Sequence, residues 1–242
     1  AYASSSVCSP TRAAIMTGKH PARVNITDWI PGLEEQPHYN NKNKPLIGPQ
    51  DLNELPLSEI TIAEVLKKNG YKTFYSGKWH LGSEGHYPED QGFDINVGGF
   101  EKGSPMGGYY TPYKNPKLED GPEGEYLTDR LTQETIDFID SRDESKPFAA
   151  FLAFYNVHTP IQENKEFYDY YKKKLKGYDD IEPVTKKEGD AITLLNQRNA
   201  KYASMVHATD NNVGKIINYL KENNLYDDTL IVFTSDNGGL ST

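Results

Sequence analysis

The 242-residue sequence contains a single cysteine, so no disulfide framework can form within the chain. It also has no run that approaches the ~20 apolar residues of a membrane-spanning helix. Basic residues are in deficit, with 26 Lys and Arg against 35 Asp and Glu and a formal net charge of −9. General nucleic-acid binders need a basic face that displaces counterions, and this charge balance argues against that class.

Segments with helical and strand-like patterns alternate along the chain. Capping residues and apolar spacing predict helices at 10–17, 61–70, 127–139 and 201–223. Apolar runs predict strands at 71–76, 147–155 and 229–234, the last two buried on both faces. This order predicts an α/β fold, with a mostly parallel sheet sandwiched by helices.

Three further segments fit no such pattern. Residues 31–57 and 83–125 are rich in Gly, Pro, Asn and aromatic residues. They are too long for simple connections, which predicts ordered functional loops or small insertions. Residues 163–190 are heavily charged, and we expect a solvated helix and loop there.

The lone cysteine, Cys8, lies at the predicted N-terminus of the first helix. Many single cysteines are small buried hydrophobic residues. A helix N-terminus, however, favours an anion through its unpaired N–H groups and its dipole. Arg12, one turn further on, adds a guanidinium suited to an oxyanion. Together these two residues indicate an anion pocket that contains a nucleophile.

Lys78 and His80 follow the strand at 71–76, and alternate residues of a strand point to one side. Such a pair can bind an oxyanion and move a proton, although a surface lysine and a packed histidine fit the spacing equally well. His158 follows the strand at 147–155. Ligands of parallel sheets bind outside the carboxyl ends of the strands, so these side chains lie where a site is expected.

Asp236 and Asn237 follow the predicted strand at 229–234 and form a third polar cluster. Their side-chain oxygens are hard ligands of the kind that Ca²⁺ or Mg²⁺ takes. The sequence Asp-Asn-Gly-Gly is also that of an ordinary turn.

The segment SVCSPTRAAIMTG at 6–18 resembles the first signature of the type I sulfatases, with a complete Cys-x-Pro-x-Arg. Residues 70–80 resemble the second signature, and His-Thr-Pro at 158–160 and Ser-Asp-Asn-Gly-Gly at 235–239 resemble two further landmarks. The resemblance spans almost the whole chain. It implies an alkaline phosphatase-like fold and a formylglycine-dependent, arylsulfatase-like enzyme.

In that family a maturation enzyme oxidises the signature cysteine, here Cys8, to formylglycine. One hydroxyl of the aldehyde hydrate attacks the sulfate sulfur and the alcohol leaves. The second hydroxyl then expels sulfate and regenerates the aldehyde, which divides one difficult hydrolysis into two easier steps.

The resemblance also implies roles for the other residues. Arg12 would hold the hydrate and its developing charge, and Lys78 would bind the sulfate oxygens and the nucleophile. His80 would accept the proton of the second hydroxyl. His158 would bind sulfate and help to protonate the leaving oxygen.

The metal implied by the resemblance is one divalent cation, usually Ca²⁺. Asp236, Asn237 and the oxidised side chain of Cys8 would bind it, so that it polarises nucleophile and sulfate together. The family's site also uses a pair of Asp residues upstream of the Cys signature and a Lys downstream of Asp-Asn-Gly, neither of which this sequence contains. We therefore expect residues 1–242 to be a partial catalytic domain, without its N-terminal metal-ligand strand and its C-terminal part. We expect its metal site to be incomplete and its own activity to be low or absent.

The resemblance suggests a sulfated small molecule or glycan as substrate, with a carbohydrate favoured. It also suggests export to the periplasm, the extracellular space or a lysosome. Two alternatives stay open: a phosphonate or phosphate ester hydrolase of the same superfamily, and a non-catalytic fragment or sulfated-glycan binder. His86, Tyr109 and Tyr110 could contact a sugar or be packed, while His38 and His207 have no motif around them.

Overall fold

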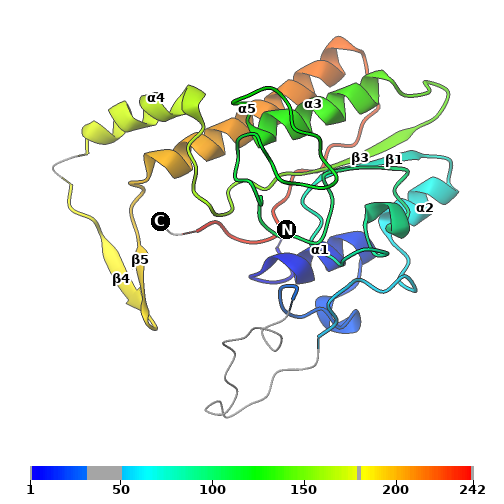
Figure 1. The fold of residues 1–242 in the computed structure, drawn as a ribbon, viewed down its shortest axis with the longest axis horizontal. Coiled ribbons are helices and arrows are strands. Elements are labelled where there is room, and N and C mark those ends of the chain that lie inside the picture. Colours follow the sequence, from blue (N-terminus) through cyan, green and yellow to red (C-terminus); the bar gives the residue numbers. More distant parts are fainter. Residues whose placement is uncertain (1, 32–50, 179–180, 241–242) are drawn as a thin grey trace.

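The computed structural model describes residues 2–31, 51–178 and 181–240 (Figure 1). Within these residues, a parallel sheet of order β2–β1–β3 forms the centre, from β1 (Lys72–Gly77), β2 (Ile95–Val97) and β3 (Phe148–Ala153). The main helices around it are α1 (Cys8–Thr17), α2 (Ile62–Lys68), α3 (Leu127–Asp140) and α5 (Ala200–Glu222). The predicted α/β fold, with a parallel sheet between helices, is confirmed.

Local sequence signals explain where the first two helices begin and end. Thr61 caps α2 by accepting a hydrogen bond from the Glu64 N–H, while the Glu64 carboxylate accepts the Thr61 N–H. Gly18 ends α1 in the left-handed conformation, and its N–H donates to the carbonyl of Ala14. No side chain caps the N-terminus of α1, which begins at Cys8.

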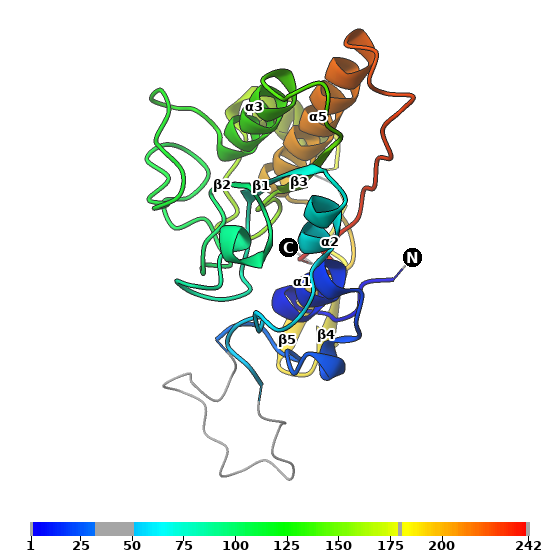
Figure 2. The ribbon, with the colours of Figure 1, turned by 90° about the vertical axis from the view of Figure 1, so that its right-hand side faces the viewer.

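The two faces of the sheet carry separate parts of the core, because successive residues of a strand point in opposite directions. Phe74 stacks on Phe138 of α3 with ring centroids 4.5 Å apart, beside Leu220 of α5. Its neighbour Tyr75 packs on the other face, with Trp79 and with Met16 of α1. Figure 2 shows α3 and α5 on one side of the strands and α1 and α2 on the other.

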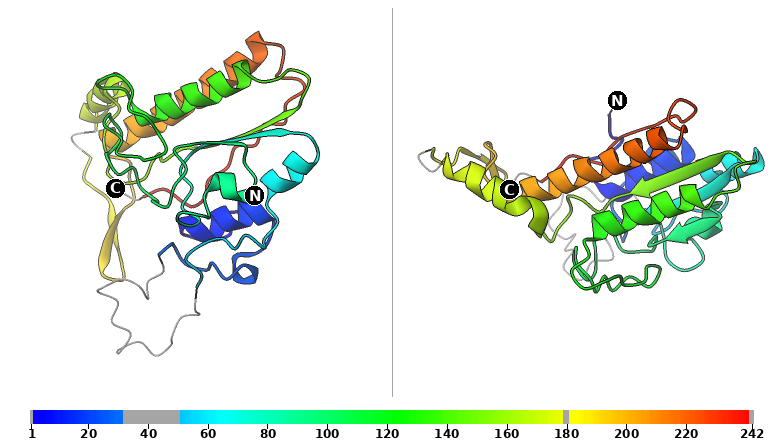
Figure 3. Two further views of the ribbon diagram at one scale, coloured as in Figure 1. Left: turned by 45° about the vertical axis from the view of Figure 1, so that its right-hand side comes forward. Right: turned by 90° about the horizontal axis from the view of Figure 1, so that it is seen from above.

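A peripheral unit packs through α4 (Lys165–Lys176) against α5 and continues into the antiparallel pair β4 (Thr185–Glu188) and β5 (Ala191–Leu194) (Figure 3). No residue of α4 is fully buried, and β4 is exposed along its length. Among the described residues, the 3₁₀ helices η1 (Pro21–Arg23) and η4 (Pro88–Gln91) lie in the long connections. None of the helices in the described ranges combines the length and apolarity required to cross a bilayer.

The predicted strand at 229–234 is not a strand in the structure. Its large apolar side chains are exposed: Leu230 is 89% exposed, and Val232 and Phe233 are each 75% exposed. A strand requires a neighbouring backbone to pair its N–H and C=O groups, and none of the described strands pairs with this run. The prediction of a buried strand at 229–234 is therefore wrong, because apolar composition carries no information about whether a pairing partner is present.

The structure describes residues 83–125 in full and residues 31–57 only at their two ends. Most of 31–57, including His38, lies outside the described residues. Residues 83–125 are ordered and mostly irregular, with η4 and β2 near their start. Tyr109 is completely buried, and its hydroxyl donates to the carbonyls of Tyr155 and His158, so its role is packing. His207 stacks on Phe167 with ring centroids 3.9 Å apart.

Candidate active site

The site forms at the carboxyl edge of the sheet, where β1 and β3 end side by side. Gly77 pairs with Ala153 in the parallel register, and the Lys78 N–H donates to the Ala153 carbonyl at 2.9 Å. Gly77 has φ +99°, and a Cβ there would lie 2.1 Å from the Ala153 oxygen. Only glycine permits this approach, which brings the residues after both strands to one place.

Cys8 begins α1 and faces this edge with a partly buried thiol. Burial alone would raise the pKa of the thiol, but interactions with His158, His80 and Lys78 lower it to about 5. The unpaired N–H groups of the first helical turn favour the same negative charge. Residue 8 therefore lies at a position built to stabilise an anion.

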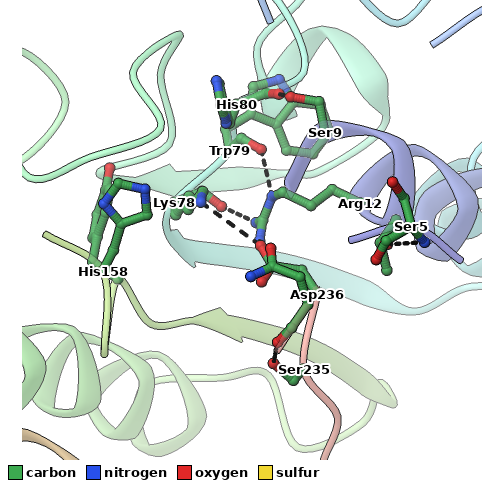
Figure 4. A network of polar contacts seen from close by, with 12 residues as sticks. Ser5, Ser9, Arg12, Lys78, Trp79, His80, His158, Ser235 and Asp236 are labelled. Atoms are coloured by element: carbon green, nitrogen blue, oxygen red, sulfur yellow. Dashed lines mark hydrogen bonds and ion pairs between the residues drawn. The ribbon is translucent and has the colours of Figure 1, made fainter. Parts of the chain in front are cut away.

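Arg12 connects α1 to the loop after β1 through several hydrogen bonds (Figure 4). Its Nε donates to the Trp79 carbonyl at 2.7 Å, and its Nη2 donates to the Lys78 carbonyl and to the Tyr75 hydroxyl. Its Nη1 lies 3.3 Å from Oδ2 of Asp236. Backbone carbonyls and one carboxylate thus occupy most of the guanidinium fork.

Lys78 and His80 are both buried, so the alternative of a surface lysine does not hold for Lys78. Burial and the charge of Arg12 lower the pKa of the Lys78 ammonium, against Cys8 and Asp236, which raise it. His80 Nε2 contacts the Ile30 carbonyl. A carbonyl can only accept, so Nε2 carries a proton. The Nδ1 of His80 is buried and has no hydrogen-bond partner in the structure.

His158 reaches the same place from β3, and Figure 4 shows it facing Lys78 and His80. Its Nδ1 donates to the carbonyl of Thr159 at 2.9 Å, which leaves Nε2 for other partners. The hydrogen bond with Cys8 raises the pKa of His158, although burial opposes this. His158 therefore favours the protonated form when residue 8 is negative.

Asp236 and Asn237 complete the cluster. Asp236 lies 3.3 Å from Arg12 and 3.7 Å from Lys78 through the same oxygen; burial alone would raise its pKa, but those cations lower it. Asn237 donates from Nδ2 to the Gly238 carbonyl, while its Oδ1 is buried without a partner. An ionised carboxylate beside an unsatisfied amide oxygen is a donor pair that fits a hard cation.

Two ligands do not make a calcium site, because Ca²⁺ takes six to eight oxygens. Across residues 2–31, 51–178 and 181–240, no group of three or more His, Cys, Asp or Glu side chains is arranged to hold a metal. Asp236 and Asn237 thus fit a cation by the type of their oxygen atoms, but they supply only part of the ligands that Ca²⁺ needs.

Sequence reasoning missed three residues that position the site. The Tyr75 hydroxyl accepts from Arg12 and donates to the Lys78 carbonyl. The Ser9 hydroxyl donates to the His80 carbonyl at 3.0 Å and accepts the Ile30 N–H at 3.1 Å. Gly103 packs against the His80 ring. Because Tyr75 follows Phe74 in the strand, its side chain lies on the opposite face of the sheet, toward α1. No local pattern in the sequence indicated that its hydroxyl would bind Arg12 and the Lys78 carbonyl.

Comparison with known proteins places this geometry in a family. A family model described as Sulfatase matches residues 1–241. The chain is 27% identical to mouse arylsulfatase J, over 98% of this chain and 36% of that protein. It is 27% identical to human N-acetylgalactosamine-6-sulfatase, over 98% of this chain and 42% of that protein.

Among solved structures, the crystal structure of Ps i-CgsB in complex with k-i-k-neocarrahexaose is 28% identical and superimposes with a TM-score of 0.68. The match covers 98% of this chain and 49% of that one. The chain therefore spans less than half the length of each of these three proteins. Because the family model covers nearly every residue and both signature segments meet at one site, the chain belongs to the sulfatase family.

Proposed function

We propose that this chain carries the nucleophile side of the active site of a sulfuric ester hydrolase. One observation carries the proposal: residue 8 lies at an unpaired helix N-terminus among Lys78, His80 and His158, which hold the pKa of its thiol near 5. A place that stabilises a thiolate also stabilises an anionic sulfate group and the charge that develops when its ester bond breaks.

Three side chains divide the work of binding and proton transfer. The buried ammonium of Lys78 holds the sulfate oxygens and the nucleophilic oxygen at residue 8. His158, whose pKa is raised, donates a proton to the leaving alcohol oxygen. His80, with its Nδ1 lone pair unused, accepts a proton from residue 8 when sulfate is released.

Arg12 contributes by position and charge. Its bonds to the Trp79 and Lys78 carbonyls fix the loop that carries Lys78 and His80. Its remaining charge, shared with Asp236, adds to the positive field around residue 8. Lysine cannot replace this fork, because it is a point charge without the planar set of donors.

Two groups supplied after synthesis would add to the site. Formylglycine at Cys8, made by a maturation enzyme, supplies a geminal diol in place of the thiol. A divalent cation, which we propose is Ca²⁺, supplies Lewis-acid polarisation, and Asp236 and Asn237 are the residues here that would hold it.

We propose a sulfated carbohydrate as substrate. The human relative is named for a sulfated amino sugar, and the solved relative is described in complex with k-i-k-neocarrahexaose. The family resemblance also supports action outside the cytoplasm. Subcellular fractionation of the producing cells checks that part of the proposal, which a purely cytoplasmic protein would overturn.

The reaction is tested on protein produced together with a formylglycine-generating enzyme. Mass spectrometry of the peptide that contains Cys8 should show the aldehyde. The turnover of these residues alone, which we expect to be low, should be faster on an aryl sulfate than on the matching phosphate and phosphonate esters. Cys8→Ala should abolish turnover. A preference for the phosphorus esters would favour the alternative hydrolase, and an unmodified thiol without turnover would favour a non-catalytic role.

A further inference from the structure

A cleft of about 390 Å³ opens beside the reaction site. His80 and His158 line it, so it is continuous with the surroundings of residue 8. Its remaining walls come from the short segments 29–31, 53–54, 82–83 and 101–104. The volume falls in the ~300–1,000 Å³ range of small-molecule sites.

Two glycines allow the walls of this cleft to meet. A Cβ on Gly103 would lie 2.4 Å from atoms of the His80 ring. A Cβ on Gly82 would lie 2.7 Å from Cβ of His86 and 2.9 Å from Cβ of Glu54. His80 itself is only 5% exposed, and its unpartnered Nδ1 belongs to a ring that lines the cleft. The shape of the cleft therefore depends on glycine at positions 82 and 103, and the cleft adjoins His80 and His158.

The lining combines a flat apolar surface with hydrogen-bonding groups. Trp29 presents a partly buried indole, and Ser104, Glu54 and Glu101 supply hydroxyl and carboxylate groups. A sugar ring has an apolar face of C–H groups and a rim of hydroxyls, which suits an aromatic platform beside hydrogen-bond acceptors. This mixture favours a sugar over a flat aromatic ligand.

The charges of the cleft are opposite to those around residue 8. The side chains of Glu54 and Glu101 remain 44% and 35% exposed. Lys102 is the only Lys or Arg among the described lining residues, and its Nζ lies 3.8 Å from Oε1 of Glu101. His86 faces Glu54 at 3.2 Å and neutralises it only when protonated. His80 and His158 belong to the surroundings of residue 8; in the rest of the lining, with His86 neutral, two carboxylates stand against one ammonium.

We propose that this cleft is the sugar subsite, and that it selects a ring whose only anionic group is the sulfate being removed. Glu54 and Glu101 accept ring hydroxyls and repel a second sulfate or a carboxylate on the same ring. The inference rests on the proposed sulfatase function and adds its substrate class: singly sulfated sugars rather than multiply sulfated ones.

The test compares kcat/KM of the mature protein on a panel of hexose monosulfates and on the hexose disulfates that contain the same ester. The preferred monosulfate should exceed its disulfates by about tenfold or more, since like charges at close range repel strongly. Glu54→Gln and Glu101→Gln should each raise turnover of the disulfates about three- to tenfold. Glu144→Gln is the matched control, because it removes an exposed carboxylate that precedes β3 and is not part of the cleft. It should leave kcat/KM on every substrate unchanged.

Trp29→Ala probes the platform separately. It should raise KM for the preferred monosulfate about three- to tenfold with little change in kcat, because only ring stacking is lost. Turnover of a small aryl sulfate reports the proposed function itself. If aryl sulfate is hydrolysed but disulfates react as fast as monosulfates in every variant, the subsite proposal is wrong and the sulfatase proposal stands.

If no sulfate ester is hydrolysed, as the incomplete metal site would explain, calorimetry still tests the subsite. Binding of hexose monosulfates and disulfates to the Cys8→Ala protein should show the same preference, weakened by Glu54→Gln. Equal affinity for both ligands, or tighter binding of the disulfates, would overturn the inference.

Discussion

Arg12 of α1 donates a 2.6 Å hydrogen bond from Nη2 to the hydroxyl of Tyr75 on β1. Both groups also donate to the same backbone carbonyl, that of Lys78. The resulting triangle ties the helix that begins at Cys8 to the loop that carries Lys78 and His80. It holds Cys8 close to Lys78 and His80.

Tyr75→Phe should therefore lower kcat on an aryl sulfate about fivefold or more, with KM little changed, because a buried hydrogen bond is worth about 1 kcal/mol. In protein made without the maturation enzyme, Tyr75→Phe should also raise the pKa of the Cys8 thiol. A purely structural defect would leave that pKa unchanged. Tyr155→Phe is the matched control, because it removes a buried hydroxyl that has no partner in the structure. Equal effects of the two variants would contradict a positioning role for Tyr75.

The thiol of Cys8 gives a pH prediction in protein made without the maturation enzyme. Its pKa is lowered to about 5, so the thiolate is present throughout the neutral range and disappears as the pH falls through that value. The rate of alkylation by iodoacetamide should be level above about pH 6 and decline below pH 5. His158→Ala should move the midpoint upward. A midpoint near that of an ordinary thiol in the unsubstituted protein would refute the described geometry.

Gly103→Ala should impair catalysis, because the added Cβ would lie 2.4 Å from the His80 ring. A displacement of about 1 Å at a catalytic group can cost roughly 100-fold in rate. Steady-state kinetics with an aryl sulfate should show the loss in kcat. Gly214→Ala on α5, where nothing lies within 4 Å of the new Cβ, should retain activity and raise the unfolding temperature slightly.

Asp236 is the described carboxylate best suited to a cation. Asp236→Asn should weaken Ca²⁺ binding at least about tenfold, because a charged hard ligand becomes a neutral one. Calorimetric titration measures this directly, and Asp210→Asn, an exposed carboxylate on α5, should bind as the unsubstituted protein does. Unchanged affinity in Asp236→Asn would remove this residue from the proposed cation site.

Asp94 links stability to pH at the other end of β1. Burial alone would raise its pKa, but the Thr73 N–H and the ammonium groups of Lys67 and Lys72 lower it. A carboxylate with a depressed folded-state pKa stabilises the fold above its unfolded pKa of about 3.9 and loses that contribution as the pH falls through the folded value.

Asp94→Asn should therefore reduce the free energy of unfolding by about 1 kcal/mol at pH 7 and by progressively less below pH 4. Denaturant titrations at several pH values measure the difference. Asp227→Asn, an exposed carboxylate, serves as the reference. A constant difference between Asp94→Asn and the unsubstituted protein at all pH values would exclude the linkage.

Much of the fold was predictable because its signals are local. The Thr61–Glu64 capping box places the start of α2, and the apolar run at 147–155 places the strand β3. The run also predicted burial on both faces, and that part is wrong, because all six residues of β3 are only partly buried. The rule that ligands bind at the carboxyl ends of parallel strands then brought Lys78 and His158 together. These inferences need no knowledge of distant partners.

The rest depended on such partners. The strands of the hairpin, β4 and β5, are four residues long, and β4 is polar and exposed, so hydrophobic periodicity gives the hairpin little signal. Tyr75 looked like an ordinary strand aromatic, since its hydroxyl is satisfied by residues on α1 and beyond β1. The site residues Lys78 and His80 were found as a pair, but the carbonyl bonds that hold Arg12 to their loop were not.

The exposed apolar run at 229–233 affects how this chain behaves in solution. Leu230, Val232 and Phe233 present an exposed apolar surface. In addition, β3 is an edge strand of the described sheet, with no strand paired to its outer side. Unpaired edges and uncovered apolar segments promote association between copies. Concentration, salt and temperature will therefore decide whether the isolated chain remains dispersed or self-associates, and charged substitutions within 229–233 are the direct means of keeping it monomeric.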